Sequence, residues 1–189
     1  MSTGTKDRIA STALDLFHAN GYSATGVSDI TRAAGVPKGS FYHFFESKEA
    51  LAAETVKLYE ATINYDLLDK GSPSPLSRIK EHLTFITTMA ELDDFQRGCL
   101  LGNFSTEMPS QSATVTAAVE RSLELWTGKL AKAIAQAQTE REISNHSDPR
   151  RLAGFIIAGF EGAVARSKLT RSRTPLDGFL ETVCSDVLA

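Results

Sequence analysis

Polar side chains gather on one short segment, residues 37–45, where a brief helix is expected. They are Lys38, Gly39, Ser40, Tyr42 and His43. Together they offer one cation, two hydroxyls, one imidazole and a glycine that permits close approach, while Phe41, Phe44 and Phe45 supply apolar anchors on the other side. Charged and hydroxyl groups on the outward side of a short, firmly anchored helix suit a groove lined by phosphates.

The surrounding residues, 27–51, predict the elements that position this face. Ser28 is expected to cap one short helix, and Gly35 stands where that helix would end in a left-handed residue. Pro37 suits the first turn of the next helix, and Ser47 is expected to cap a longer third helix. Two short helices joined by a tight turn and followed by a third form a helix-turn-helix.

At these residues the chain resembles the N-terminal domain of the TetR/AcrR family of bacterial transcriptional regulators. The similarity begins where Ile9, Ala13 and Phe17 lie four residues apart, and it continues through AAGVPKGSFYHFFESKEAL. The resemblance implies an all-helical two-fold dimer with a DNA-reading N-terminal domain and a variable C-terminal domain that binds an effector. Gly26 departs from the family, which often has Ser or Thr at this place.

The resemblance and the outward face together predict a set of DNA contacts: Thr25, Ser28, Lys38, Gly39, Ser40, Tyr42, His43 and Lys48. Both lysines stand at the start of a helix and are expected to meet phosphates. Two alternatives stay open, because Tyr42 can bury its ring and expose only its hydroxyl, and His43 can be a plain surface residue. A core helical hairpin is disfavoured, since it gives no reason for polar residues on the outward side.

Charge limits the kind of DNA binding that is expected. Residues 1–55 hold five Lys and Arg against six Asp and Glu, and the whole chain carries a net charge of −3. A broad basic surface for coating nucleic acid is therefore excluded, and affinity must come from a local patch doubled by a dimer. This balance fits a site-specific regulator.

Composition sets further bounds. The 189 residues include 42% hydrophobic ones but no apolar run long enough to span a bilayer, and the start, MSTGTKDR, lacks the apolar stretch of a signal peptide. Only two cysteines are present, Cys99 and Cys184, which favours a reducing, cytoplasmic setting over a disulfide scaffold.

Catalytic and metal-binding patterns are not found in the sequence. The four histidines, His18, His43, His82 and His146, are scattered, so no metal site is expected. The chain contains no nucleophile elbow, no phosphate-cradling glycine loop and no pair of carboxylates in a plausible catalytic site, so we expect neither a cofactor nor enzyme activity.

The rest of the chain predicts an all-α protein of about nine helices. A fourth helix is expected over residues 48–68 as one stiff rod, with later helices over 75–92, 101–107 and 111–141. Ser74, Asp148 and Thr174 each precede a proline, which predicts three capped helix starts. We therefore expect a DNA-binding domain over residues 1–50 and an effector-binding and dimerisation domain over 51–189.

Small residues near the C-terminal end predict a subunit interface. Gly154, Ala158 and Gly162 recur every four residues, a spacing that lets two helices approach closely. With Phe155, Phe179 and Val183 they are expected to form a two-fold four-helix bundle. The alternative is that the glycines only admit bulky neighbours within one subunit.

The segment RGCLLGNFSTEM, residues 97–108, resembles the pocket entrance of one branch of the family. The expected effector-binding residues are His82, Phe85, Ile86, Met89, Cys99, Asn103, Phe104, Glu107, Met108, Trp126, Phe160 and Glu161. This set is mostly apolar with a few polar groups, as small-molecule sites are, although each residue could equally belong to the core.

The sequence thus predicts a ligand-responsive regulator that forms a homodimer and binds double-stranded operator DNA, most simply a repressor released from a palindromic operator by a small molecule. Two alternatives stay open. One is a helical dimer whose C-terminal pocket recognises a protein partner. The other is a sensor of electrophiles or oxidants in which Arg97 activates the Cys99 thiol.

Overall fold

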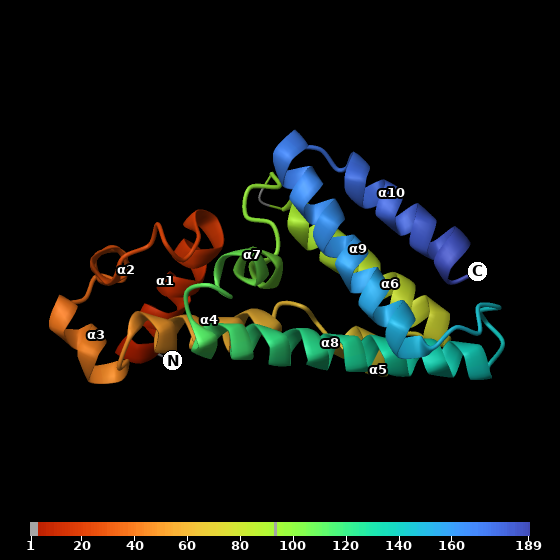
Figure 1. Cartoon of the computed structure of the whole chain (residues 1–189), viewed down its shortest axis with the longest axis horizontal. Coiled ribbons are helices and arrows are strands. Elements are labelled where there is room, and N and C mark those ends of the chain that lie inside the picture. The colour runs from red at the N-terminus through yellow and green to blue at the C-terminus, as the bar shows by residue number, and fades with distance from the viewer. Residues whose placement is uncertain (1–3, 93) are drawn as a thin grey trace. The chain divides into compact units, whose positions relative to one another are not determined.

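The described residues, 4–92 and 94–189, form an all-helical structure in the computed structural model (Figure 1). Ten α-helices and one π-helix are present in this part of the chain, and it contains no strand. The predicted all-α class with an N-terminal helix-turn-helix is confirmed, and the helix number is close to the expected nine. None of these helices is long and apolar enough to cross a membrane.

The helices separate into two compact units. Unit 1 holds the chain up to Thr62 together with Leu100–Ser122, and unit 2 holds Ile63–Cys99 and Leu123–Ala189. The C-terminal domain expected from residue 51 onward is thus interleaved, because residues 100–122 lie with the N-terminal helices.

Unit 1 contains α1 (Thr5–Asn20), α2 (Val27–Ala33), α3 (Lys38–Phe44), α4 (Lys48–Glu60), α7 (Leu100–Glu107) and the first ten residues of α8 (Ala113–Thr139). The turns follow the sequence signals. Gly35 takes the left-handed φ of 64° expected of it, and the Ser47 hydroxyl accepts a hydrogen bond from the Ala50 N–H at 3.1 Å. The core includes Ile9, Phe17, Ile30, Phe41 and Leu51, all fully buried.

Two expectations in unit 1 are wrong. Ser28 lies inside α2 and does not cap it; Gly26 is the N-cap, and the Asp29 carboxylate accepts its N–H at 3.1 Å. The fourth helix ends at Glu60 instead of residue 68, and Asn64 then takes a positive φ of 53° before α5 (Asp66–Lys70) begins. Ile63 and Leu68 are both buried, but Ile63 lies in the bend between the two helices and Leu68 lies in α5, so their apolar spacing does not mark one rod.

Unit 2 contains α5, α6 (Pro75–Glu91), the remainder of α8, α9 (Pro149–Thr170), α10 (Thr174–Thr182) and the π-helix η1 (Val183–Val187). Two of the three predicted caps are confirmed. The Ser74 hydroxyl accepts from the Ser77 N–H at 3.0 Å, and the Asp148 carboxylate accepts from the Arg151 N–H at 2.8 Å.

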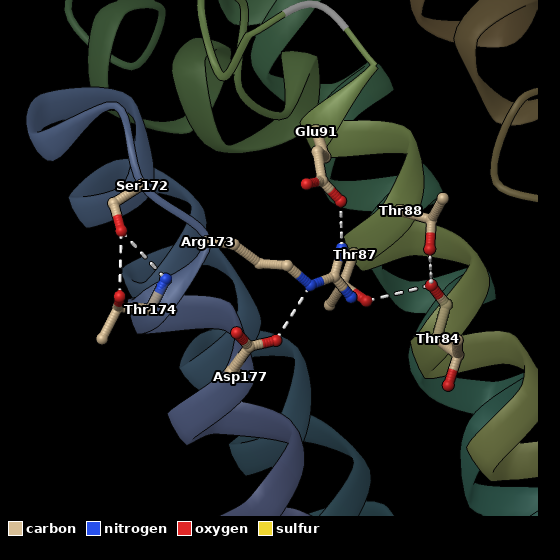
Figure 2. Close-up of polar contacts among 8 residues, drawn as sticks. All are labelled: Thr84, Thr87, Thr88, Glu91, Ser172, Arg173, Thr174 and Asp177. Atoms are coloured by element: carbon tan, nitrogen blue, oxygen red, sulfur yellow. Dashed lines mark hydrogen bonds and ion pairs between the residues drawn. The ribbon is translucent and has the colours of Figure 1, made fainter.

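The third predicted cap, at Thr174, is wrong. Thr174 is the first helical residue of α10, and its N–H donates to the Ser172 hydroxyl at 3.2 Å. The preceding Arg173 forms an ion pair with Glu91 of α6 and another with Asp177 of α10, at 2.9 Å, as Figure 2 shows. The ion pairs of Arg173 and the Ser172 hydroxyl therefore hold this helix start, and the Thr174 hydroxyl does not cap it.

Candidate nucleic-acid interface and effector region

Helix α3 presents the polar face that the sequence predicts. Lys38, Gly39 and His43 are exposed and Ser40 is half-buried. Tyr42 is 61% exposed, so its ring lies outside the core. The alternative in which Tyr42 buries its ring and exposes only its hydroxyl does not apply. A short polar helix face held on a rigid apolar base is suited to entering a DNA groove.

The apolar side of α3 anchors it in unit 1. Phe41 and Phe45 are buried, with ring centroids 5.8 Å apart. Phe44 is exposed, so the prediction that it anchors the helix is wrong. The turn before α3 is held by the Val36 N–H, which donates to the Thr31 carbonyl at 3.0 Å. Two rings and one turn thus fix the direction of the helix.

Thr25 cannot make the predicted DNA contact in this structure. Only 2% of the residue is exposed, and its hydroxyl donates to the carbonyls of Gly21 at 2.8 Å and Leu16 at 3.3 Å. Thr25 therefore closes the end of α1. Ser28, in contrast, is exposed in the first turn of α2, where it stays a predicted contact.

Lys48 at the start of α4 is engaged inside unit 1. Its ammonium lies 3.9 Å from the centroid of the Tyr22 ring, a cation–π contact. Burial lowers the pKa of Lys48, and the carboxylates of Glu107 and Glu49 oppose this shift. The predicted phosphate contact would therefore compete with the Tyr22 ring for this cation.

Glu107, predicted to bind an effector, instead binds the segment that follows α1. Its carboxylate accepts the N–H groups of Tyr22 at 2.9 Å and of Ser23 at 2.7 Å. Burial alone would raise the pKa of Glu107, but these hydrogen bonds and Lys48 hold it below its ordinary value. Sequence reasoning missed Tyr22 and Ser23, because their partner lies more than eighty residues away along the chain.

The other effector candidates on α7 and just after it also serve unit 1. Phe104 is fully buried, with its ring centroid 6.1 Å from that of Phe17 and 6.5 Å from that of Tyr22. Met108 is fully buried too, and Asn103 is half-buried. Phe104 and Met108 thus build the core beside the helix-turn-helix.

Unit 2 brings the remaining eight candidates onto α6, α8, α9 and the residue before α7. At the centre, the Trp126 indole N–H donates to His82 Nε2 at 2.9 Å, and the Phe160 ring lies 5.7 Å from that of Trp126. Phe85 is half-buried and Ile86 is buried, whereas Met89 is exposed. Apart from Met89, the placement is compatible with a largely apolar lining.

His82 is held neutral. Burial lowers its pKa to about 4, and the backbone of Asn64 opposes the shift only in part. Because Nε2 accepts the Trp126 hydrogen bond, the proton of the neutral ring must sit on Nδ1. That Nδ1 is buried, and the backbone of Asn64 is a hydrogen-bond partner of the ring besides Trp126.

Cys99 lies next to Glu161 of α9. The thiol is buried, and a hydrogen bond joins the two side chains. Burial raises the pKa of Glu161 to about 7, against which the Cys99 contact acts. Glu161 Oε1 is buried without a hydrogen-bond partner in the part of the chain described here. Buried polar atoms are normally paired, so Glu161 Oε1 is the group of these eight residues most available to a bound molecule.

The outward face of α9 carries the small-residue series. Gly154, Ala158 and Gly162 are all exposed, and a side-chain carbon added at either glycine would meet no atom within 4 Å. Large apolar residues accompany them, since Phe155 is 61% and Leu169 84% exposed. Packing within the chain therefore does not explain these two glycines.

Phe179 and Val183, predicted at the same interface, are instead buried within unit 2. The Phe179 ring lies 6.0 Å from that of Phe160, and a side-chain carbon at Gly159 would come within 3.4 Å of it. The alternative explanation, a glycine that admits a bulky neighbour of the same subunit, thus applies to Gly159. The inward side of α10 packs on α9 and leaves Gly178 exposed.

No group of three or more His, Cys, Asp or Glu residues suited to a metal ion occurs within residues 4–92 and 94–189.

Comparison with known sequences agrees with this arrangement. Residues 9–55 match the sequence model of the bacterial regulatory proteins of the tetR family, and residues 75–183 match that of the tetracyclin repressor-like C-terminal domain. The HTH-type transcriptional repressor DhaR of Mycobacterium sp. (strain GP1) is 37% identical over 190 residues, covering 98% of this chain and 93% of the relative.

Solved structures give the same result. The regulatory protein TetR from Rhodobacter sphaeroides superposes with a TM-score of 0.87 at 33% identity, covering 94% of this chain and 96% of that one. The reduced form of Escherichia coli NemR superposes with a TM-score of 0.87 at 26% identity, covering 98% of both chains.

Proposed function

Since the chain belongs to the TetR family of bacterial transcriptional regulators, we propose that it is a repressor that binds a palindromic operator as a homodimer and leaves it when a small molecule binds. The observation that carries the proposal is α3, whose exposed Lys38, Tyr42 and His43 stand on the buried Phe41 and Phe45. Polar groups on a firmly based helix are suited to reading base edges and phosphates.

The dimer is supported by the outward face of α9. An exposed apolar face that includes Phe155 and Leu169 is costly for an isolated soluble subunit, and Gly154, Ala158 and Gly162 allow a second helix to lie close. Two-fold pairing would present two copies of α3, which would read half-sites about one or more helical turns apart.

The effector site is proposed in unit 2, around His82, Trp126, Phe160 and Glu161. Its rings offer an apolar surface, while Glu161 Oε1 is a buried oxygen without a hydrogen-bond partner among the described residues. Such a combination favours a small, mostly apolar molecule with one or two hydrogen-bonding groups. Its binding would lower operator affinity only by its differential affinity for the two states of the protein.

A second candidate is thiol-based sensing through Cys99. The hydrogen bond to Glu161 favours it, because a carboxylate beside a thiol can accept its proton. Burial of Cys99 disfavours it, since an electrophile or oxidant must first reach the sulfur. A Cys99→Ser protein that keeps operator binding and its response to the effector would exclude this candidate.

Footprinting on the DNA upstream of the chain's own gene tests the main proposal. The wild-type protein should protect an inverted repeat, and a Lys38→Ala, Tyr42→Phe double variant should not. Lys57→Ala is the matched control, because Lys57 is an exposed lysine of the same unit that pairs with Glu54 on α4. Absence of any protected inverted repeat with the wild-type protein would refute operator binding at this locus.

A further inference from the structure

The connection between α1 and α2, residues 21–26, is held from a distant part of the chain. Glu107, the last residue of α7, accepts both the Tyr22 N–H at 2.9 Å and the Ser23 N–H at 2.7 Å. Hydrogen bonds from neutral amides to a carboxylate are stronger than those to a neutral acceptor. One side chain thus fixes two successive peptide groups directly before the helix-turn-helix.

The neighbouring residues fit this arrangement. Ser23 and Gln111, which follows α7, exchange side-chain hydrogen bonds of 3.1 and 3.0 Å. Gly21 has a φ of 84°, and a side-chain carbon there would lie 3.2 Å from Glu107 Oε2. The positive φ favours glycine at this position, and a side chain there would also press on the Glu107 carboxylate.

A third element closes the cluster. Lys48, at the start of α4, covers the Tyr22 ring at 3.9 Å, and the Tyr22 hydroxyl is hydrogen-bonded to Glu49. Helix α4 follows directly after the reading helix α3, so Tyr22 contacts the chain on the far side of the helix-turn-helix. Glu107 consequently holds a residue that touches both the entry to and the exit from the DNA-reading elements.

We infer that Glu107 is a positioning residue for DNA reading: it sets the place of the α1–α2 connection on α7, and through Tyr22 and Lys48 the direction of α3. This inference rests on the proposed function. It assigns to the C-terminal end of α7 a role in operator recognition although Glu107 itself touches no DNA-reading residue of α3. A glutamine cannot replace it, because an amide has only one acceptor oxygen and its NH₂ group would face a second N–H donor.

Hydrogen exchange of single amides, followed by NMR on the full-length protein, tests the contact itself. In Glu107→Gln and Glu107→Ala, the Tyr22 and Ser23 amides should exchange about ten- to a hundred-fold faster than in the wild type. Glu120→Ala is the matched control, because Glu120 is an exposed glutamate of α8 in the same unit. Unchanged exchange at both amides in both variants would overturn the inference.

Binding to DNA tests the positioning role. Misdirected reading helices lose base contacts but keep their phosphate contacts, so the ratio of operator affinity to nonspecific DNA affinity should fall about ten-fold in Glu107→Gln, with an unchanged salt dependence. A merely structural role would leave this ratio unchanged in the folded variant. An equal ratio in variant and wild type would therefore overturn the inference.

The two measurements separate the possible failures. If the wild-type protein protects no operator, the proposed function is refuted. The positioning role is then refuted as well, whatever the exchange rates of the Tyr22 and Ser23 amides are. If the wild-type protein binds its operator and Glu107→Gln binds it with the same selectivity, only the positioning role falls. A selective loss together with faster exchange supports both.

Discussion

Replacing Glu161 with glutamine should remove a pH-dependent penalty from the free energy of unfolding. In the folded chain, burial raises the pKa of this carboxyl from 4.5 to about 7. A raised pKa means that the folded state binds the proton more tightly than the unfolded state. Glu161 therefore contributes most to stability below pH 4.5, and the contribution is lost as the pH rises through about 7.

The size of the effect follows from the same two values. The interval from 4.5 to about 7, at about 1.4 kcal/mol per pH unit, amounts to roughly 3 kcal/mol. In the wild-type protein this stability is lost between those pH values, whereas Glu161→Gln has no proton to lose there. His82 acts in the opposite direction, because its pKa is lowered to about 4, but it is common to both proteins and cancels in the difference.

Urea unfolding at several pH values between 4.5 and 8, at one fixed protein concentration, measures this difference. The stability of Glu161→Gln relative to the wild type should rise by roughly 3 kcal/mol across the range. Glu181→Gln, at an exposed glutamate of α10, is the control and should show no such trend. Parallel curves for Glu161→Gln and the wild type would refute the reasoning, and with it the argument that burial raises the pKa of this carboxyl.

Three further predictions concern dimerisation, DNA binding and the core. Ala158→Leu should overpack a close helix pair by about 1–3 kcal/mol per subunit and weaken the dimer by at least about thirty-fold; a variant that sediments as a dimer at low concentration would contradict this. Lys38→Ala should lower the salt dependence of operator binding by about one charge, while Lys57→Ala leaves it unchanged. Trp126→Phe should cost about 1–3 kcal/mol in urea unfolding, because His82 Nε2 loses its donor; an equally stable variant would show that this hydrogen bond contributes nothing.

Local signals in the sequence predicted much of the fold. The left-handed Gly35 and the capping residues Ser47, Ser74 and Asp148 were all identified correctly, because each depends on a few neighbouring residues. The outward stripe of α9 also follows from spacing alone. The cap predicted at Thr174 is wrong because Ser172 and the ion pairs of Arg173 hold that helix start, and the pairing of Arg173 with Glu91 on α6 leaves no trace in the local sequence.

The candidate site was harder to predict. The spacing of apolar residues indicates which side chains are buried, but it does not distinguish a side chain of the core from one that lines a ligand pocket. Phe104 and Glu107 are residue types that occur in small-molecule pockets. In this structure Phe104 packs in the core of unit 1, and Glu107 holds the segment after α1 by hydrogen bonds. Thr25 was expected to contact DNA through its hydroxyl, yet that hydroxyl donates to two backbone carbonyls of its own unit. In each case the deciding partner is distant along the chain or belongs to the backbone, where side-chain patterns carry no information.

The interleaving of unit 1 limits how this chain can be recombined with its relatives. A chimera that joined residues 1–55 to a foreign C-terminal part would leave Tyr22 and Ser23 without Glu107, although each half matched a complete family domain. The backbone N–H groups of Tyr22 and Ser23 would lose their acceptor, and Phe17 would lose the ring of Phe104. The portable module for exchanging DNA specificity is therefore discontinuous: it includes residues 100–122 as well as the N-terminal helices.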